Sequence, residues 1–204
     1  MNKDRFEAFS DGVFAFAITL LILAFSLPAD RRLSESELRS AILGLWPTFI
    51  AYALSFGVIA IMWQNHHALF RRIRRIDRMT VLLNLILLAG TAFIPFATNT
   101  LASYPAMRPS TFLYGLTLCW TATAFNLLLL HFVRAHAFAP DVSRQTIAAT
   151  VRAYRTGWVV YTLATLLALW LPVVSFGAYV AIAIYYLVPR GVDSDVVAGP
   201  PHQR

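Results

Sequence analysis

The chain has 204 residues, of which 58% are hydrophobic and 13% are charged, and its formal net charge is +7. Soluble domains average about a quarter charged residues, so this composition, with a mean hydropathy of +0.62, excludes an ordinary soluble domain. The apolar residues form long blocks and the basic residues lie between them, which favours orientation in a membrane over binding to nucleic acid. We therefore predict an all-α integral membrane protein with no soluble domain.

Candidate membrane-spanning helices need about 20 apolar residues each. Six stretches are candidates, at residues 10–27, 41–65, 79–101, 110–133, 157–171 and 176–188. The last two are short, and neighbouring helices or a thinned bilayer would have to shield their ends. We expect one transmembrane domain over residues 1–190 and a disordered cytoplasmic tail over residues 191–204.

The connectors between these spans carry signals of their own. Ser34 and Glu37 have the spacing of a capping box, so a helix is expected to begin there and to continue into the second span. In the basic connector 134–155, an amphipathic helix is expected from Val142 onward. Residues 172–175 contain a proline and are expected to turn the chain between the last two spans.

The distribution of basic residues predicts the orientation. Six spans place both termini on one side of the membrane, and most Lys and Arg residues fall on that side. The opposite side receives Arg31, Arg32, Arg39 and Arg108. Because basic residues are enriched on the cytoplasmic side, we expect both termini to be cytoplasmic and the protein to reside in the cell inner membrane.

The first span has a bulky face and a small-residue face. At helical spacing, the bulky face contains Phe9, Val13, Phe16, Leu20, Leu23 and Leu27, and the small one Ala8, Gly12, Ala15, Thr19 and Ser26. One interpretation is that the bulky face contacts lipid. The other is that several copies of the helix surround an axis, so that the bulky face forms a hydrophobic constriction in a pore.

A carboxylate at the start of this span, Asp11, is costly to place and needs a reason. It lies off the bulky face. Either Ser10 or Asp11 caps the first helix, or Asp11 holds the helix mouth in a polar network.

Further polar residues lie at the cytoplasmic end of the second span, in the sequence Trp63-Gln64-Asn65-His66-His67. Adjacent histidines point in different directions, and without a nearby Cys or carboxylate we expect no metal site. His66 or His67 is a candidate partner of Asp11 or Ser10, whereas the alternative is anchoring at the level of the lipid headgroups. In the third and fourth spans, interhelical hydrogen bonds are expected from Asn84, Thr91, Thr98, Asn126 and His131.

The functional motifs exclude more than they identify. The chain has no phosphate loop, nucleophile elbow or zinc-helix motif, so we expect neither an enzyme nor a cofactor. It also lacks the filter sequence of carbonyl-lined potassium channels. A small multi-span membrane transporter is the alternative to a channel, although no second intramembrane carboxylate and no repeated halves support it. A third possibility is a membrane protein whose Arg-rich loops bind anionic lipid.

Three segments resemble the transmembrane protein 175 family in its bacterial form. They are Arg5-x-x-x-Phe9-Ser10-Asp11-Gly12-Val13-Phe14-Ala15 with Ala17-Ile18-Thr19-Leu20-Leu21, then Trp63-x-Asn65-His66-His67-x-Leu69-Phe70, and finally Asn84-Leu85 with Ile94-Pro95-Phe96. The resemblance covers nearly the whole chain. It implies a potassium-permeable leak channel, a homotetramer in which the first helix of each subunit lines a central pore.

The resemblance also implies roles for single residues. The hydrophobic constriction carries over to Phe16, Leu20 and Leu23, with Thr19 as a polar residue that flanks it. A network at the helix mouth would contain Arg5, Ser10, Asp11, Asn65, His66 and His67. Phe16 departs from the family, which usually has isoleucine at this constriction, and four phenylalanines around one axis would be bulkier.

Overall fold

The computed structural model describes residues 3–28 and 32–186, and these residues form helices joined by short loops. The predicted tail at residues 191–204 lies outside the described residues. The elements are α1 (Lys3–Leu20), the 3₁₀-helix η1 (Leu21–Ala24), α2 (Glu35–Gly44), α3 (Trp46–Arg71), α4 (Arg78–Ser103), α5 (Arg108–Arg134), α6 (Arg144–Leu167) and α7 (Pro172–Tyr186).

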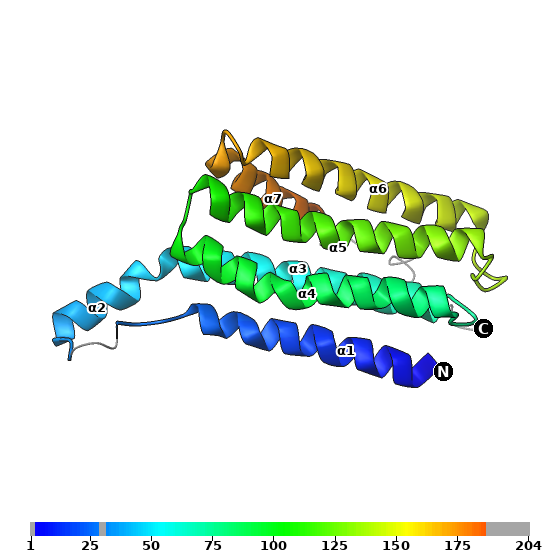
Figure 1. Cartoon of the computed structure of the whole chain (residues 1–204), viewed down its shortest axis with the longest axis horizontal. Helices are drawn as coiled ribbons and strands as arrows, with labels where there is room; N and C mark the ends of the chain where they lie inside the picture. Colours follow the sequence, from blue (N-terminus) through cyan, green and yellow to red (C-terminus); the bar gives the residue numbers. More distant parts are fainter. Residues whose placement is uncertain (1–2, 29–31, 187–204) are drawn as a thin grey trace, which may run out of the picture.

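The long helices run side by side in a bundle, from which α2 projects at one end (Figure 1). Helix α4 packs against α5, α5 packs against α6, and α1 packs against α3 and α4. None of the residues of α2 is buried. The arrangement confirms the predicted all-helical fold and leaves one face of α1 uncovered by the rest of the described chain.

Within the described residues, four stretches are long and apolar enough to cross a membrane. They are Lys3–Ala24, Glu35–Arg71, Arg78–Ser103 and Arg108–Arg134. Helix α7 is apolar but has 15 residues, and α6 carries Arg144, Arg152 and Arg155. A membrane protein is therefore established, whereas the fifth and sixth spans remain a prediction.

The first helix begins earlier than predicted. It starts at Lys3 and not near Ser10, so Ser10 and Asp11 lie inside the helix and neither caps it. The polar residues before the apolar run support helix because Lys3 pairs with Glu7 one turn later, at 3.7 Å. In addition, the side chain of Phe6 is 3% exposed and packs against Phe70, with ring centroids 5.3 Å apart.

The capping box at Ser34 is confirmed. The backbone N–H of Glu37 donates to the Ser34 hydroxyl, and the Glu37 carboxylate accepts from the backbone N–H of Ser34 at 2.8 Å. The helix that begins there ends at Gly44, and α3 starts at Trp46 with Pro47 in its first turn, where the missing N–H of proline costs nothing.

The last two helices differ from the prediction. The amphipathic helix expected from Val142 and the span expected from residue 157 form one continuous helix, α6, which begins after the capping residue Ser143. Residues 172–175 do not turn the chain, because Pro172 is the first residue of α7. The turn lies at residues 168–171, and proline favours the start of a helix over its interior.

Candidate functional site

Helix α1 has a buried face and an exposed face. The buried face contains Phe6, Ser10, Phe14 and Ala17, which continue into Leu21 and Ala24 of η1. This face packs against α3 and α4. No described residue covers the opposite face, which belongs to a stretch apolar enough to lie in a membrane.

Large apolar side chains dominate the exposed face. Phe16 is 65% exposed and Leu23 is 70% exposed, whereas Leu20 is half-buried. Thr19 is also exposed, and its hydroxyl donates to the backbone carbonyl of Phe16 at 2.8 Å. A threonine hydroxyl that donates its hydrogen within the helix still has oxygen lone pairs that can accept a hydrogen bond.

The helix changes type at the end of this face. The α-helix ends at Leu20, the 3₁₀ turn η1 follows, and the chain is extended at Phe25. Residues three apart eclipse each other in a 3₁₀ turn, so Leu23 lies nearly in line with Leu20. Phe16 and Leu20 are four apart on the α-helix and also share a face. The predicted constriction residues therefore lie along one side of α1 and η1.

Beneath the exposed face, a buried chain of hydrogen bonds joins α1, α3 and α4. The Asn84 amide donates to the Ser10 hydroxyl at 2.9 Å, and Ser10 donates to the carbonyl of Phe6 at 3.1 Å. Because the amide nitrogen of Asn84 faces Ser10, its oxygen accepts from His66 Nε2 at 2.8 Å. His66 therefore carries its proton on Nε2.

Aromatic rings enclose His66 in this chain. Its ring stacks on Phe70, with centroids 4.3 Å apart, and lies 5.3 Å from Phe14. Both Ser10 and Asn84 are fully buried, and His66 is 1% exposed. A buried polar chain of this kind fixes the rotation of α1 because any other rotation would leave donors without acceptors.

Asp11 is held separately, at the edge of the same interface. Its carboxylate accepts from the indole N–H of Trp63 on α3 at 2.9 Å. His67 stacks against Trp63, with ring centroids 6.1 Å apart. The candidate hydrogen bond from a histidine to Asp11 or Ser10 is not formed directly: Asn84 connects His66 to Ser10, and Trp63 connects α3 to Asp11.

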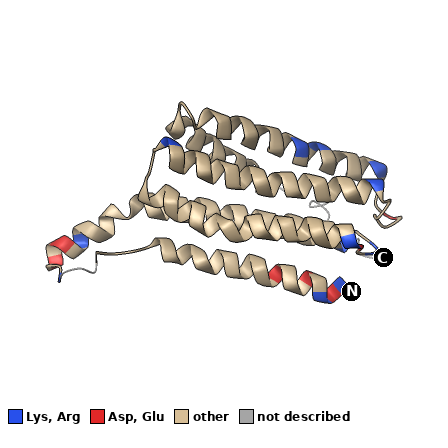
Figure 2. Ribbon diagram, in the orientation of Figure 1, with Lys and Arg blue, Asp and Glu red and all other residues tan. Residues whose placement is uncertain are grey.

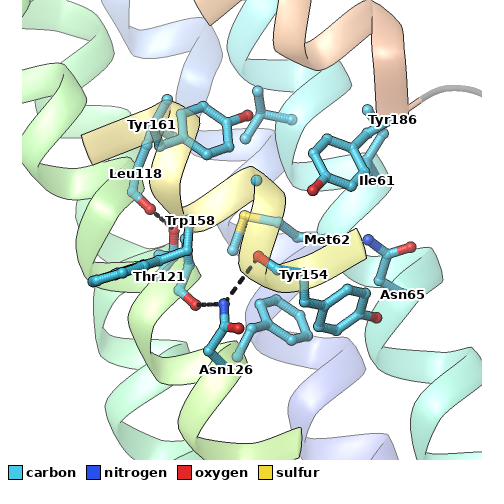
Figure 3. Close-up of a pocket in the computed structure, with 14 residues that line it drawn as sticks. Ile61, Met62, Asn65, Leu118, Thr121, Asn126, Tyr154, Trp158, Tyr161 and Tyr186 are labelled. Atoms are coloured by element: carbon cyan, nitrogen blue, oxygen red, sulfur yellow. Dashed lines mark hydrogen bonds between the residues drawn. The ribbon is translucent and has the colours of Figure 1, made fainter. Parts of the chain in front are cut away.

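Arg5 and Asn65 do not join these contacts. Arg5 is exposed and forms no hydrogen bond or ion pair with any described residue. Asn65 lines a cavity of about 80 Å³ to which α3, α5, α6 and α7 contribute, with no residue from α1 (Figure 3). The Asn126 amide in this cavity donates to the carbonyl of Tyr154 at 3.2 Å.

The other polar residues of the third and fourth spans behave as predicted with one exception. Thr98 donates to Ser55 on α3 at 2.8 Å, and His131 pairs with Asp77 at 2.9 Å. Thr91 instead donates to the carbonyl of Leu87 in its own helix. The described residues contain no group of three His, Cys, Asp or Glu side chains that could hold a metal ion.

Fold and site together define a multi-span helical membrane protein whose first helix is locked on one face and exposes apolar side chains on the other. The model of the family described as "Endosomal/lysosomal potassium channel TMEM175" matches residues 5–95. A potassium channel of Streptomyces collinus is 39% identical over 193 residues, which cover 91% of this chain and 92% of that protein. The chain belongs to the TMEM175 family.

Two further relatives extend this finding. The crystal structure of a lysosomal potassium-selective channel TMEM175 homolog from Chamaesiphon minutus matches with a TM-score of 0.82 and 35% identity, over 91% of this chain and 96% of that one. The human endosomal/lysosomal proton channel TMEM175 is 33% identical over 156 residues, which cover 70% of this chain and 31% of the human protein.

Proposed function

We propose that the protein is a potassium-permeable leak cation channel, a homotetramer in which α1 of each subunit lines a central pore. The observation that carries this proposal is the exposed apolar face of α1, where Phe16 is 65% exposed and Leu23 is 70% exposed. The bacterial relatives are described as potassium channels, which supports potassium as the permeant ion.

The proposed filter is an apolar constriction formed by Phe16, Leu20 and Leu23. Such a constriction gates and selects by excluding water, without a ring of backbone carbonyls. An ion has to lose part of its hydration shell to pass, and K⁺ loses water at a lower cost than Na⁺ does. The hydroxyl oxygen of Thr19, next to this constriction, would replace part of the lost hydration.

The contacts beneath this face would set its geometry. In this proposal, Ser10 and Asp11 face α3 and α4, and His66 lies on α3 itself. All three therefore act on permeation only through the position of α1. The side chains of Arg5 and Asn65 take no part in the contacts that join α1 to α3 and α4. In this proposal they would contribute through the neighbouring subunit or through solvent.

We further propose six membrane spans, with α6 and α7 as the fifth and sixth. We also propose that the channel resides in the cell inner membrane with both termini in the cytoplasm. The start of α1 lies at the same end of the bundle as the α3–α4 and α5–α6 loops, since Lys3 donates to the carbonyl of Ile73 at 2.9 Å. That end carries most of the basic residues (Figure 2), as the positive-inside rule requires of a cytoplasmic side.

The test is an ion-flux measurement on the purified protein in liposomes, with empty liposomes as the control. A leak channel gives a potassium flux that needs no proton gradient, rises linearly with driving force and exceeds the sodium flux. Equal potassium and sodium fluxes would contradict the proposed selectivity. A flux that saturates with substrate, or that requires a proton gradient, would indicate the alternative, a small multi-span transporter.

A further inference from the structure

The basic end of the bundle is built as a fixed surface. The α3–α4 loop and the α5–α6 loop form an antiparallel bridge between Ile73 and Phe138. Two backbone hydrogen bonds flank it: Arg74 N–H donates to Ala137 at 3.0 Å, and Ala139 N–H donates to Arg72 at 2.9 Å. The two loops therefore hold each other in place.

Buried side chains anchor this bridge to the bundle. Ile73 is 2% exposed, and the Phe138 ring lies 6.3 Å from Phe132, which in turn lies 5.6 Å from Phe70. Lys3 adds a hydrogen bond from α1 to the carbonyl of Ile73. A loop fixed at both backbone and side chain loses little further entropy when it binds a ligand.

Exposed arginines surround the bridge. They are Arg71, Arg74, Arg75, Arg78 and Arg134, which we call the basic platform, and Figure 2 shows basic residues gathered at this end. None of the five side chains forms a hydrogen bond or ion pair with another described residue. Their guanidinium groups are therefore available to an external anion.

Asp77, the carboxylate in the loop between α3 and α4, forms no ion pair with these five side chains. Asp77 caps α4 by accepting from the backbone N–H of Thr80 at 2.7 Å, and it also accepts from His131. The hydrogen bond from the Thr80 backbone is the main reason that the pKa of Asp77 is lowered to about 2. Asp77 is thus ionised but already committed to partners within the chain.

We propose that the basic platform binds the phosphate of an anionic phospholipid headgroup. Arginine forms bidentate hydrogen bonds with phosphate oxygens, and the platform lies at the ends of α3, α4 and α5, all of which belong to spans. Headgroups are the anions present at the level where spans end, which favours lipid over nucleic acid. The proposal depends on membrane insertion and not on the proposed channel activity.

The test measures lipid retained by the purified protein, using native mass spectrometry after extraction from membranes with equal amounts of phosphatidylglycerol and phosphatidylcholine. The wild type should retain phosphatidylglycerol in excess. The variant R74Q/R134Q removes one arginine from each side of the bridge, and each removal should reduce this retention about fivefold. The matched control R39Q/R108Q removes two exposed arginines from the opposite end and should leave it unchanged.

Two further measurements keep the result interpretable. R74K/R134K keeps the charge but loses the fork geometry, so it should fall between wild type and R74Q/R134Q. If the glutamine variant fails to fold, raising the salt on the wild type to about 1 M, where the screening length is about 3 Å, should release the lipid. Equal retention of both lipids by the wild type, equal losses in the site and control variants, or binding of inorganic phosphate without phosphatidylglycerol would overturn the proposal. None of these readings requires ion flux.

Discussion

At the scale of single residues, the side chain of Asn84 fixes the position of α1 against α3 and α4. Its amide group serves two helices at once, donating to Ser10 on α1 and accepting from His66 on α3. Few side chains can do both in one plane, because a carboxylate only accepts and an ammonium only donates. The sequence indicated Asn84 as a hydrogen-bonding residue, but it could not show that two particular partners meet there.

Replacement of Asn84 should therefore destabilise the fold. Asn84→Ala leaves the Nε2 proton of His66 without its acceptor and the Ser10 oxygen without its donor, and each orphaned buried group costs about 1–3 kcal/mol. The measurement is the thermal unfolding midpoint in detergent. Thr91→Ala is the control, because Thr91 bonds only to the carbonyl of Leu87 in its own helix. An equal drop in both variants would show that the interhelical bonds contribute nothing particular.

At the scale of elements, α1 could be predicted in outline but not at its ends. Its helical character followed from the apolar run, and the position of Asp11 off the bulky face is in keeping with the Trp63 contact. Its early start depends on the burial of Phe6 against Phe70, a tertiary contact that local pattern does not encode. The same holds for the pairing of Asp11 with Trp63, since the rotation of α3 decides which side chain faces the carboxylate.

The change of helix type at Leu21 affects the geometry of the proposed constriction. Because η1 brings Leu23 nearly in line with Leu20, a polar group at Leu20 would lie in the middle of the proposed apolar constriction. Leu20→Asn should therefore raise single-channel conductance or lower the preference for potassium over sodium, because it wets the constriction. Planar-bilayer recording provides both quantities.

The matched control for this variant is Leu163→Asn, which puts the same amide on α6 at a side chain that is 61% exposed. It should leave conductance and ion preference as in the wild type. If Leu20→Asn also behaves like the wild type, Leu20 does not line the pore, and the exposed face of α1 has another partner.

At the scale of the whole molecule, the helices fall into two groups around α1. Helices α3 and α4 contact α1 directly, whereas α5, α6 and α7 pack behind them. The family model matches residues 5–95, which begin in α1 and end within α4. The sequence segments on which the resemblance depends also lie in α1, η1, α3 and α4. The family resemblance is therefore carried by the same helices that contact α1.

We expect Asp11 to affect the assembly of the proposed tetramer more than ion permeation. Asp11→Ala removes the acceptor of the Trp63 indole and loosens α1 at its edge. We therefore expect a smaller fraction of the proposed tetramer, with unchanged ion preference in the tetramers that form. Size-exclusion chromatography with light scattering gives the fraction, and bilayer recording gives the preference. Trp63→Phe, which loses the same bond from the other side, should reproduce the effect. A normal tetramer with altered selectivity would contradict this role.

The second group of helices was the harder part to predict. The sequence predicted an amphipathic helix in the basic connector and a separate span from residue 157, yet Arg144–Leu167 form one helix. Asn126 and Thr123 account for part of this continuity, because Asn126 donates to the backbone of Tyr154, and Thr123 accepts from Trp158 at 2.8 Å. Contacts of this kind bind α6 to α5 along its length and outweigh the local charge pattern.

The order in which the chain is synthesised gives the buried hydrogen bonds another meaning. Ser10 and Asp11 leave the ribosome with α1, but the partner of Asp11 follows 52 residues later and that of Ser10 follows 74 residues later. During this interval the Asp11 carboxylate and the Ser10 oxygen lack the donors that they have in the folded chain, and unsatisfied polar groups are costly in lipid. A chain that stops before α4 therefore lacks the Asn84 amide that bonds to Ser10, and its first helix has only α3 as a partner.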